Sequence, residues 1–185
     1  DNGSHAAYVL SLAFELLPEE KCQAAADKLV ENIERQGNHL TTGFVSISRL
    51  CPTLSKYGYE DVAYTLLTNK TYPSWGYSIE RGATTIWERW DSCKPDGTID
   101  YSADKAGMNS LNHYSFGSIS EWMFTNSLGI ELDDESAGFG HFVLQPEAFK
   151  NRDIDIDYAK GYYESIHGTI KSDWSFDKDG GIVYK

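Results

Sequence analysis

Between Trp87 and Trp90 the sequence places one carboxylate between two indoles, with an arginine beside it. The carboxylate belongs to Glu88, and a glutamate set among apolar rings can act as a general base. Indole rings offer flat apolar faces and one hydrogen-bonding edge, which suits the C–H faces of a sugar ring. The alternative is an ordinary ion pair of Glu88 with Arg89 on a surface turn. The local sequence leaves both interpretations open.

Tryptophans gather around this group, because four of the five lie in one part of the chain: Trp75, Trp87, Trp90 and Trp122. A single tryptophan most often fills a core, since large aromatic side chains are highly buried on average. Their grouping in an irregular stretch and in the helix predicted after it favours a second role, in which several of them line a binding pocket.

His113 is a further candidate. Asn109, His113, Gly117 and Ser120 recur at the spacing of one helix face, so small and polar groups can line a pocket there. The alternative is a core histidine bonded to a backbone carbonyl. The other histidines and the three widely spaced cysteines show no metal-ligand pattern, so we expect no metal site.

Helical periodicity predicts the elements that position these residues. Residues 6–17 form an apolar, buried helix that Pro18 ends. The next helix buries one stripe, made of Cys22, Ala25, Ala26, Leu29 and Ile33. Two more helices follow over 45–57, closed by Gly58, and over 59–67. Alternating buried and amphipathic helices are what stacked αα-hairpins require.

The periodicity then changes twice. Residues 70–108 lose the helical pattern and predict a long irregular segment, which is usually functional in a compact domain. A last helix is expected over about 109–128. After Glu131 the pattern predicts four short strands, at 142–144, 154–158, 166–170 and 182–184. Five helices are too few to close a ring of inner helices, so we expect the chain to be the later part of a larger protein.

Composition excludes several classes of protein. The 185 residues carry 28 acids against 16 bases, a net charge of -12 that offers no electrostatic footprint for nucleic acid. No apolar stretch approaches the roughly 20 residues that span a bilayer, and no polybasic segment would hold the chain to anionic lipid. We therefore expect neither a nucleic-acid nor a membrane partner.

Four motifs resemble one family, and they occur in the family's order: His39–Phe44 (HLTTGF), Tyr72–Tyr77 (YPSWGY), Gly82–Asp91 (GATTIWERWD) and Met108–Tyr114 (MNSLNHY). These runs are similar to those of bacterial α-L-rhamnosidases of glycoside hydrolase family 78. The resemblance covers most of residues 5–128 and continues weakly beyond. Four motifs in register are far more specific than any one of them.

The resemblance implies a fold and a reaction. Residues 1–130 would be the C-terminal part of an (α/α)6 toroid, mainly α-helical, and residues 131–185 a segment of an antiparallel β-sandwich. The family hydrolyses terminal α-L-rhamnosides with inversion and without a cofactor. Its general base corresponds to Glu88 and its sugar-contacting histidine to His113, and Trp75 and Trp90 would line the pocket.

One part of the family's machinery is absent from this sequence. In the family, the general acid belongs to a D-G-x-x-x-x-E motif, and no segment of this sequence matches that motif. We therefore expect the chain alone to be inactive. Other readings stay open: a non-catalytic carbohydrate-binding or interaction module, or another glycosidase or lyase on the same toroid. The exposed edge of an open toroid would also favour a homo-oligomer. The compartment stays undetermined.

Overall fold

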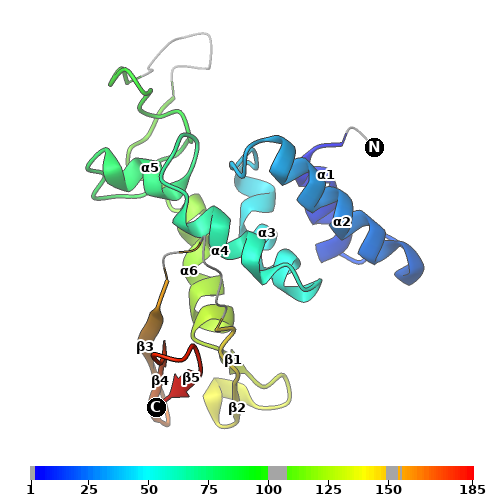
Figure 1. Ribbon diagram of the computed structural model, residues 1–185, viewed down its shortest axis with the longest axis vertical. Coiled ribbons are helices and arrows are strands. Elements are labelled where there is room, and N and C mark those ends of the chain that lie inside the picture. Colours follow the sequence, from blue (N-terminus) through cyan, green and yellow to red (C-terminus); the bar gives the residue numbers. More distant parts are fainter. Residues whose placement is uncertain (1–2, 100–107, 149–153, 155) are drawn as a thin grey trace. The chain divides into compact units, whose positions relative to one another are not determined.

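The computed structural model describes residues 3–99, 108–148, 154 and 156–185. It consists of two units along the chain, Asp1–Ile119 and Ser120–Lys185. The first is built from helices and the second mainly from small antiparallel sheets (Figure 1). This order of helices followed by small antiparallel sheets confirms the predicted fold class.

The first helix is shorter than predicted. Helix α1 (His5–Ala13) begins where the Ser4 hydroxyl accepts a hydrogen bond from the Ala7 N–H at 3.2 Å. It ends four residues before Leu17, because the chain turns at Glu15, whose φ is 53°. The prediction of a helix buried on all sides is therefore wrong for its end: Phe14 is 59% and Leu16 69% exposed.

The second helix has the predicted stripe. Helix α2 (Glu19–Arg35) follows Pro18 and buries Ala26, Leu29 and Ile33, together with Val30. Its charged residues lie on the opposite, exposed side, so apolar spacing alone determined which side packs. Cys22 and Ala25, at the start of the stripe, are only half-buried.

Helix α3 (Phe44–Lys56) lies at the centre of the first unit. It packs against both α1 and α4 (Glu60–Thr68), as Figure 1 shows. Its buried residues include Ile47, Leu50 and Leu54. The predicted bounds of both helices hold to within one residue, and Gly58 follows α3 at a φ of 80°. The residue before α3, Gly43, brings the chain into the site described below.

The stretch predicted to be irregular contains one short helix, α5 (Trp75–Glu80). The Ser74 hydroxyl caps it by accepting a hydrogen bond from the Tyr77 N–H at 3.0 Å. Six residues are too few to show helical periodicity, which is why the sequence pattern missed this helix. The predicted irregular residues 100–107 lie outside the described part of the chain.

The last predicted helix begins later than expected. Residues 108–114 are not helical, and the helical segments follow in three short pieces: the 3₁₀-helix η2 (Ser115–Ser118), α6 (Ile119–Trp122) and the π-helix η3 (Met123–Ser127). The predicted face of Asn109, His113, Gly117 and Ser120 therefore does not exist. The reason is tertiary, because the backbone of 110–113 pairs with residues 86–88 instead.

The second unit contains two antiparallel sheets. Strand β1 (Ile130–Leu132) pairs with β2 (Phe142–Leu144), and β3 (Tyr158–Ser165), β4 (Gly168–Phe176) and β5 (Ile182–Tyr184) form a three-stranded sheet. The strands at 142–144 and 182–184 are as predicted. The strand predicted at 166–170 is wrong at its start, where residues 166–167 form the turn between β3 and β4.

The strand predicted at 154–158 overlaps an observed strand only at its last residue, Tyr158. Strand β3 begins at Tyr158, and Ile154 lies in a bend instead. Asp155, inside the predicted strand, lies outside the described residues. The alternation of Ile and Asp resembled a half-buried strand, but the pairing with β4 extends to Ser165, well beyond it.

The core of this unit lies on one side of the three-stranded sheet. Leu128, Ile130 and Ile170 form its buried cluster, with Phe139 and Ala159 packed against it. Gly161 admits this packing, because a Cβ on it would lie 2.4 Å from Cδ1 of Leu128.

Candidate active site

A cleft of about 400 Å³ opens in the first unit beside the start of α3. Its lining combines charged and aromatic side chains with the residues that lead into the helix: Thr41, Thr42, Gly43, Phe44, Tyr72, Glu88, Arg89, Trp90, Asp91 and Phe116. Two of the four predicted site residues, Glu88 and Trp90, therefore lie in one cleft. The other two, Trp75 and His113, are not part of this lining, but each contacts a residue that is: Trp75 contacts Trp90, and His113 contacts Phe44.

Glu88 is held by a segment more than twenty residues later in the chain. The Ser110 N–H donates to Glu88 Oε2 at 2.6 Å, and the Glu88 N–H donates to the Ser110 carbonyl at 2.9 Å. A further backbone bond, from the His113 N–H to the Ile86 carbonyl at 2.7 Å, extends this pairing. Among the described residues, only Ser110 hydrogen-bonds to the carboxylate, so Oε1 keeps its capacity to accept a proton.

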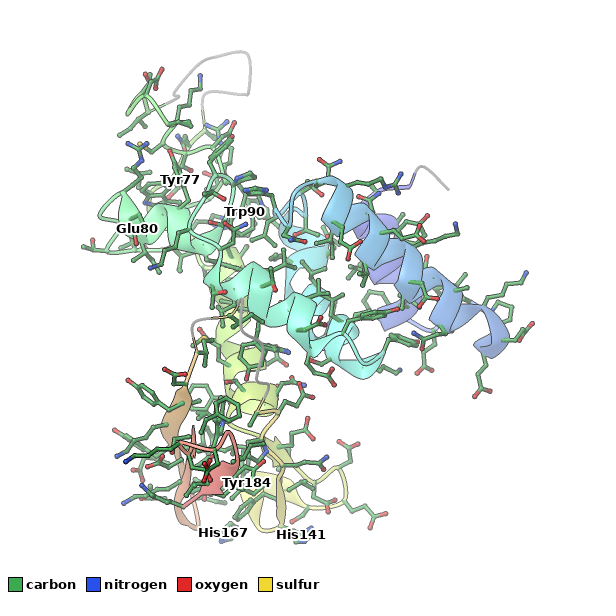
Figure 2. All side chains as sticks on the ribbon, in the orientation of Figure 1. Tyr77, Glu80, Trp90, His141, His167 and Tyr184 are labelled. Atoms are coloured by element: carbon green, nitrogen blue, oxygen red, sulfur yellow. The ribbon has the colours of Figure 1, made fainter. Side chains whose placement is uncertain are left out.

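Trp90 is fixed from two sides. Its Nε1–H donates to the Thr42 carbonyl at 2.8 Å, and its ring stacks on that of Phe116 with centroids 3.8 Å apart and planes 4° apart. The side chain remains half-buried, and Figure 2 labels it. A ring held in this way presents a rigid apolar surface, which suits the C–H face of a sugar.

Trp75 lies behind Trp90 rather than beside it. It is 8% exposed, meets Trp90 edge to face at 5.4 Å, and donates its Nε1–H to the Phe116 carbonyl at 2.8 Å. Its polar edge is thus bonded within the protein, and little of the ring surface is left for a ligand. Its place in the structure is that of a support for Trp90.

His113 lies in a non-helical segment, outside the helix face that was predicted for it. Its ring stacks on Phe44 with centroids 4.6 Å apart, and its Nδ1 accepts a hydrogen bond from the Ser115 N–H at 3.4 Å. It is therefore not bonded to a backbone carbonyl through this nitrogen, and it is half-buried rather than in the core. It contacts the cleft through Phe44, which lines it.

Several lining residues were not singled out from the sequence. Phe44 and Tyr72 belong to two of the quoted motifs, so the signal was present in the runs HLTTGF and YPSWGY. Asp91 closes the run that contains Glu88 and adds a second carboxylate to the cleft. Phe116 had no signal of its own, because only the stacking on Trp90 reveals its place.

The charges in the lining come from three residues of one run. Glu88 and Asp91 are acidic and Arg89 is basic, which leaves the lining with an excess of one negative charge.

Within the part of the chain that the structure describes, no three His, Cys, Asp or Glu side chains gather as a metal ion would require. None of the described helices is long and apolar enough to cross a membrane.

Comparison with known families matches nearly the whole chain. Residues 1–127 match the model of the bacterial alpha-L-rhamnosidase 6 hairpin glycosidase domain, and residues 129–185 match that of the bacterial alpha-L-rhamnosidase C-terminal domain. Both matches follow the order of helices and sheets in the structure.

Individual relatives agree. An alpha-L-rhamnosidase of Streptomyces avermitilis is 42% identical over 180 residues, and one of Formosa agariphila is 48% identical over 173 residues. These alignments cover 97% and 93% of this chain but only 16% and 18% of the relatives, so the chain spans less than a fifth of their length.

Solved structures share the fold. The Streptomyces avermitilis alpha-L-rhamnosidase complexed with L-rhamnose superposes with a TM-score of 0.87 over 98% of this chain and 17% of that one. The alpha-L-rhamnosidase of Aspergillus terreus gives 0.84 at 32% identity, over 99% of this chain and 20% of that one. On sequence and structure together, the chain belongs to the bacterial α-L-rhamnosidase family.

Proposed function

We propose that this chain is part of an inverting α-L-rhamnosidase, in which the cleft holds a terminal L-rhamnose and Glu88 is the general base. One observation carries the proposal: Glu88 and Trp90 line the same cleft, so a proton acceptor and an apolar ring face the same space. Membership in the family, and a relative's structure with L-rhamnose, make that sugar the first ligand to consider.

The proposed reaction needs little movement of Glu88. Ser110 N–H holds Oε2, and Oε1 accepts a proton from a water molecule as the water attacks the anomeric carbon. The glycosidic bond breaks, and a second carboxylic acid gives its proton to the leaving oxygen. Because the water enters opposite the leaving group, the configuration inverts. Such enzymes place the two carboxyl groups about 6.5–9.5 Å apart.

The second carboxylic acid is the missing part. The only other carboxylate in the described lining of the cleft, Asp91, belongs to the same short run as Glu88, whereas the acid must stand across the sugar. The family's D-G-x-x-x-x-E motif does not occur in this sequence. We therefore propose that the chain binds L-rhamnose without hydrolysing rhamnosides.

Two measurements test this function. We expect an NMR titration to show L-rhamnose binding to the purified chain, weakened about tenfold by Trp90→Ala, a loss of about 1.4 kcal/mol. Tyr158→Ala is the matched control, because Tyr158 is an exposed aromatic residue of β3, in the other unit. It should leave the affinity unchanged.

The same samples test the reaction. An aryl α-L-rhamnoside should stay intact with the purified chain. Turnover that Glu88→Gln abolishes would contradict the proposed inactivity but support Glu88 as the base. If the chain binds no L-rhamnose, or binds it equally well after Trp90→Ala, the cleft is not the sugar site.

A further inference from the structure

Thr42 has a buried hydroxyl group without a hydrogen-bond partner among the described residues, a state it shares with Ser118, which does not line the cleft. The residue lines the cleft, yet it is only 1% exposed. Its carbonyl is occupied, since it accepts the Trp90 Nε1–H at 2.8 Å. Its Oγ1 is buried, and no residue in 3–99, 108–148, 154 or 156–185 forms a hydrogen bond with it.

Several other hydroxyls of the described residues are paired. Ser74, 1% exposed, accepts the Tyr77 N–H at 3.0 Å, and Ser172, 3% exposed, donates to the Leu128 carbonyl at 2.7 Å. Even Thr41, the exposed neighbour of Thr42, has its Oγ1 2.8 Å from His5 Nδ1. Buried polar groups are nearly always bonded, because losing water without a replacement partner is unfavourable. An unpaired hydroxyl in the lining of a cleft therefore calls for a partner that enters the cleft.

We propose that Thr42 Oγ1 is a sugar-recognition group that bonds a hydroxyl of the pyranose in this cleft. The inference rests on the proposed function and adds a specificity-determining residue to its site. Rotation about χ1 moves Oγ1 from one staggered position to another, and a threonine side chain has more than one accessible rotamer. The hydroxyl can thus turn from its unpaired position toward a ligand held between Trp90 and Glu88.

The energetic consequence distinguishes this role from a structural one. In the free protein the hydroxyl does not stabilise the fold, because it has lost its water and lacks a bond in the described part of the chain. In the complex it gains a bond. Removing it should therefore weaken ligand binding without weakening the fold, whereas removal of a structural hydroxyl does the reverse.

Thr42→Val is the direct test, because valine keeps the shape and replaces the hydroxyl with a methyl group. We expect the affinity for L-rhamnose, measured by NMR titration of the whole chain, to fall about three- to tenfold. The urea midpoint of unfolding should stay the same or rise. Thr42→Ser retains the hydroxyl and should keep most of the affinity.

Thr65→Val is the matched control. Its Oγ1 donates to the Asp61 carbonyl at 2.8 Å within α4, and it does not line the cleft. This variant should leave L-rhamnose binding unchanged.

Each outcome decides one point. If Thr42→Val binds L-rhamnose as the wild type does, the proposed role of Thr42 is wrong while the sugar site stands. If Thr42→Val lowers the urea midpoint, the hydroxyl is paired in the free protein and the inference is also wrong. If the wild-type chain binds no L-rhamnose, the proposed function itself fails.

Discussion

Two tryptophans, one in each unit, are anchored in the same way and end in different environments. Trp90 donates its Nε1–H to the Thr42 carbonyl at 2.8 Å, and Trp174 donates its own to the Ser127 carbonyl at 2.7 Å. Trp174 is fully buried, whereas Trp90 is half-buried and lines a cleft. An anchored indole is therefore no sign of a binding site. What distinguishes Trp90 is partial exposure in a cleft whose lining also contains the Glu88 carboxylate.

The two units also position their side chains by different means. In the second unit a single hairpin places Trp174 and Ile170 on one side of the sheet, because residues two apart on a strand share a face. In the first, Thr42, Phe116 and the run that contains Glu88 come from three separate segments. Strand register is a local property, but the cleft depends on long-range contacts.

The largest effect should come from Trp174→Ala. This substitution removes one of the largest fully buried side chains of the second unit, leaves a cavity and removes the donor to the Ser127 carbonyl, so we expect the free energy of unfolding to fall by about 3–5 kcal/mol. Urea unfolding followed by circular dichroism measures it. Trp174→Phe, which keeps much of the volume but loses the donor, should cost less. If Trp174→Ala lowers the free energy of unfolding no more than Trp90→Ala does, burial does not explain the difference between the two tryptophans.

A pair of glycines should give a smaller difference. Gly129 and Gly58 both have positive φ, 66° and 80°, so alanine strains either backbone by about 1–2 kcal/mol. A Cβ on Gly129 would also lie 2.1 Å from backbone atoms of Gln145 and Pro146, whereas one on Gly58 meets nothing within 4 Å. We expect Gly129→Ala to cost about 1–3 kcal/mol more than Gly58→Ala in urea unfolding. Equal losses of unfolding free energy in the two variants would show that the backbone near Gln145 moves to make room for the added methyl group.

The smallest effect should be a difference in pH dependence. Burial lowers the pKa of His5 in α1 below its ordinary 6.5, so the unfolded chain binds a proton first as the pH falls. Its contribution is thus complete above pH 6.5 and is lost as the pH falls from there through the lowered pKa. Unfolding midpoints measured from about pH 8 to about pH 5 should fall in the wild type and less steeply in His5→Gln.

In the second unit the corresponding group titrates at lower pH. The Glu135 N–H, and then His141, hold the pKa of Asp133 below its ordinary 3.8. Figure 2 labels His141 at one end of this unit. Asp133 should therefore stabilise the fold above pH 3.8 and lose that contribution only below it. If stability is lost near pH 6 to the same extent in His5→Gln as in the wild type, the assignment of separate pH ranges to His5 and Asp133 is wrong.

The accuracy of the sequence predictions depended on how local each feature is. The later part of the buried stripe of α2, from Ala26 to Ile33, was predicted correctly, because hydrophobic spacing along one helix can be recognised without knowing what packs against it. The helix expected over 109–128 was wrong in its first part. There the backbone of Ser110 and His113 bonds to residues 86–88, and tertiary pairing overrides the local pattern.

The sequence by itself determined the family, the order of helices and strands, and the choice of Glu88 as the candidate base, since motifs and periodicity are carried by neighbouring residues. Only the tertiary structure decided which predicted residues line the cleft. It placed Trp90 at the surface of the cleft, Trp75 behind it and His113 against Phe44. It also left the Thr42 hydroxyl without a partner among the described residues. The physical reason is that exposure and pairing depend on contacts between segments far apart in the chain, which residue spacing does not encode.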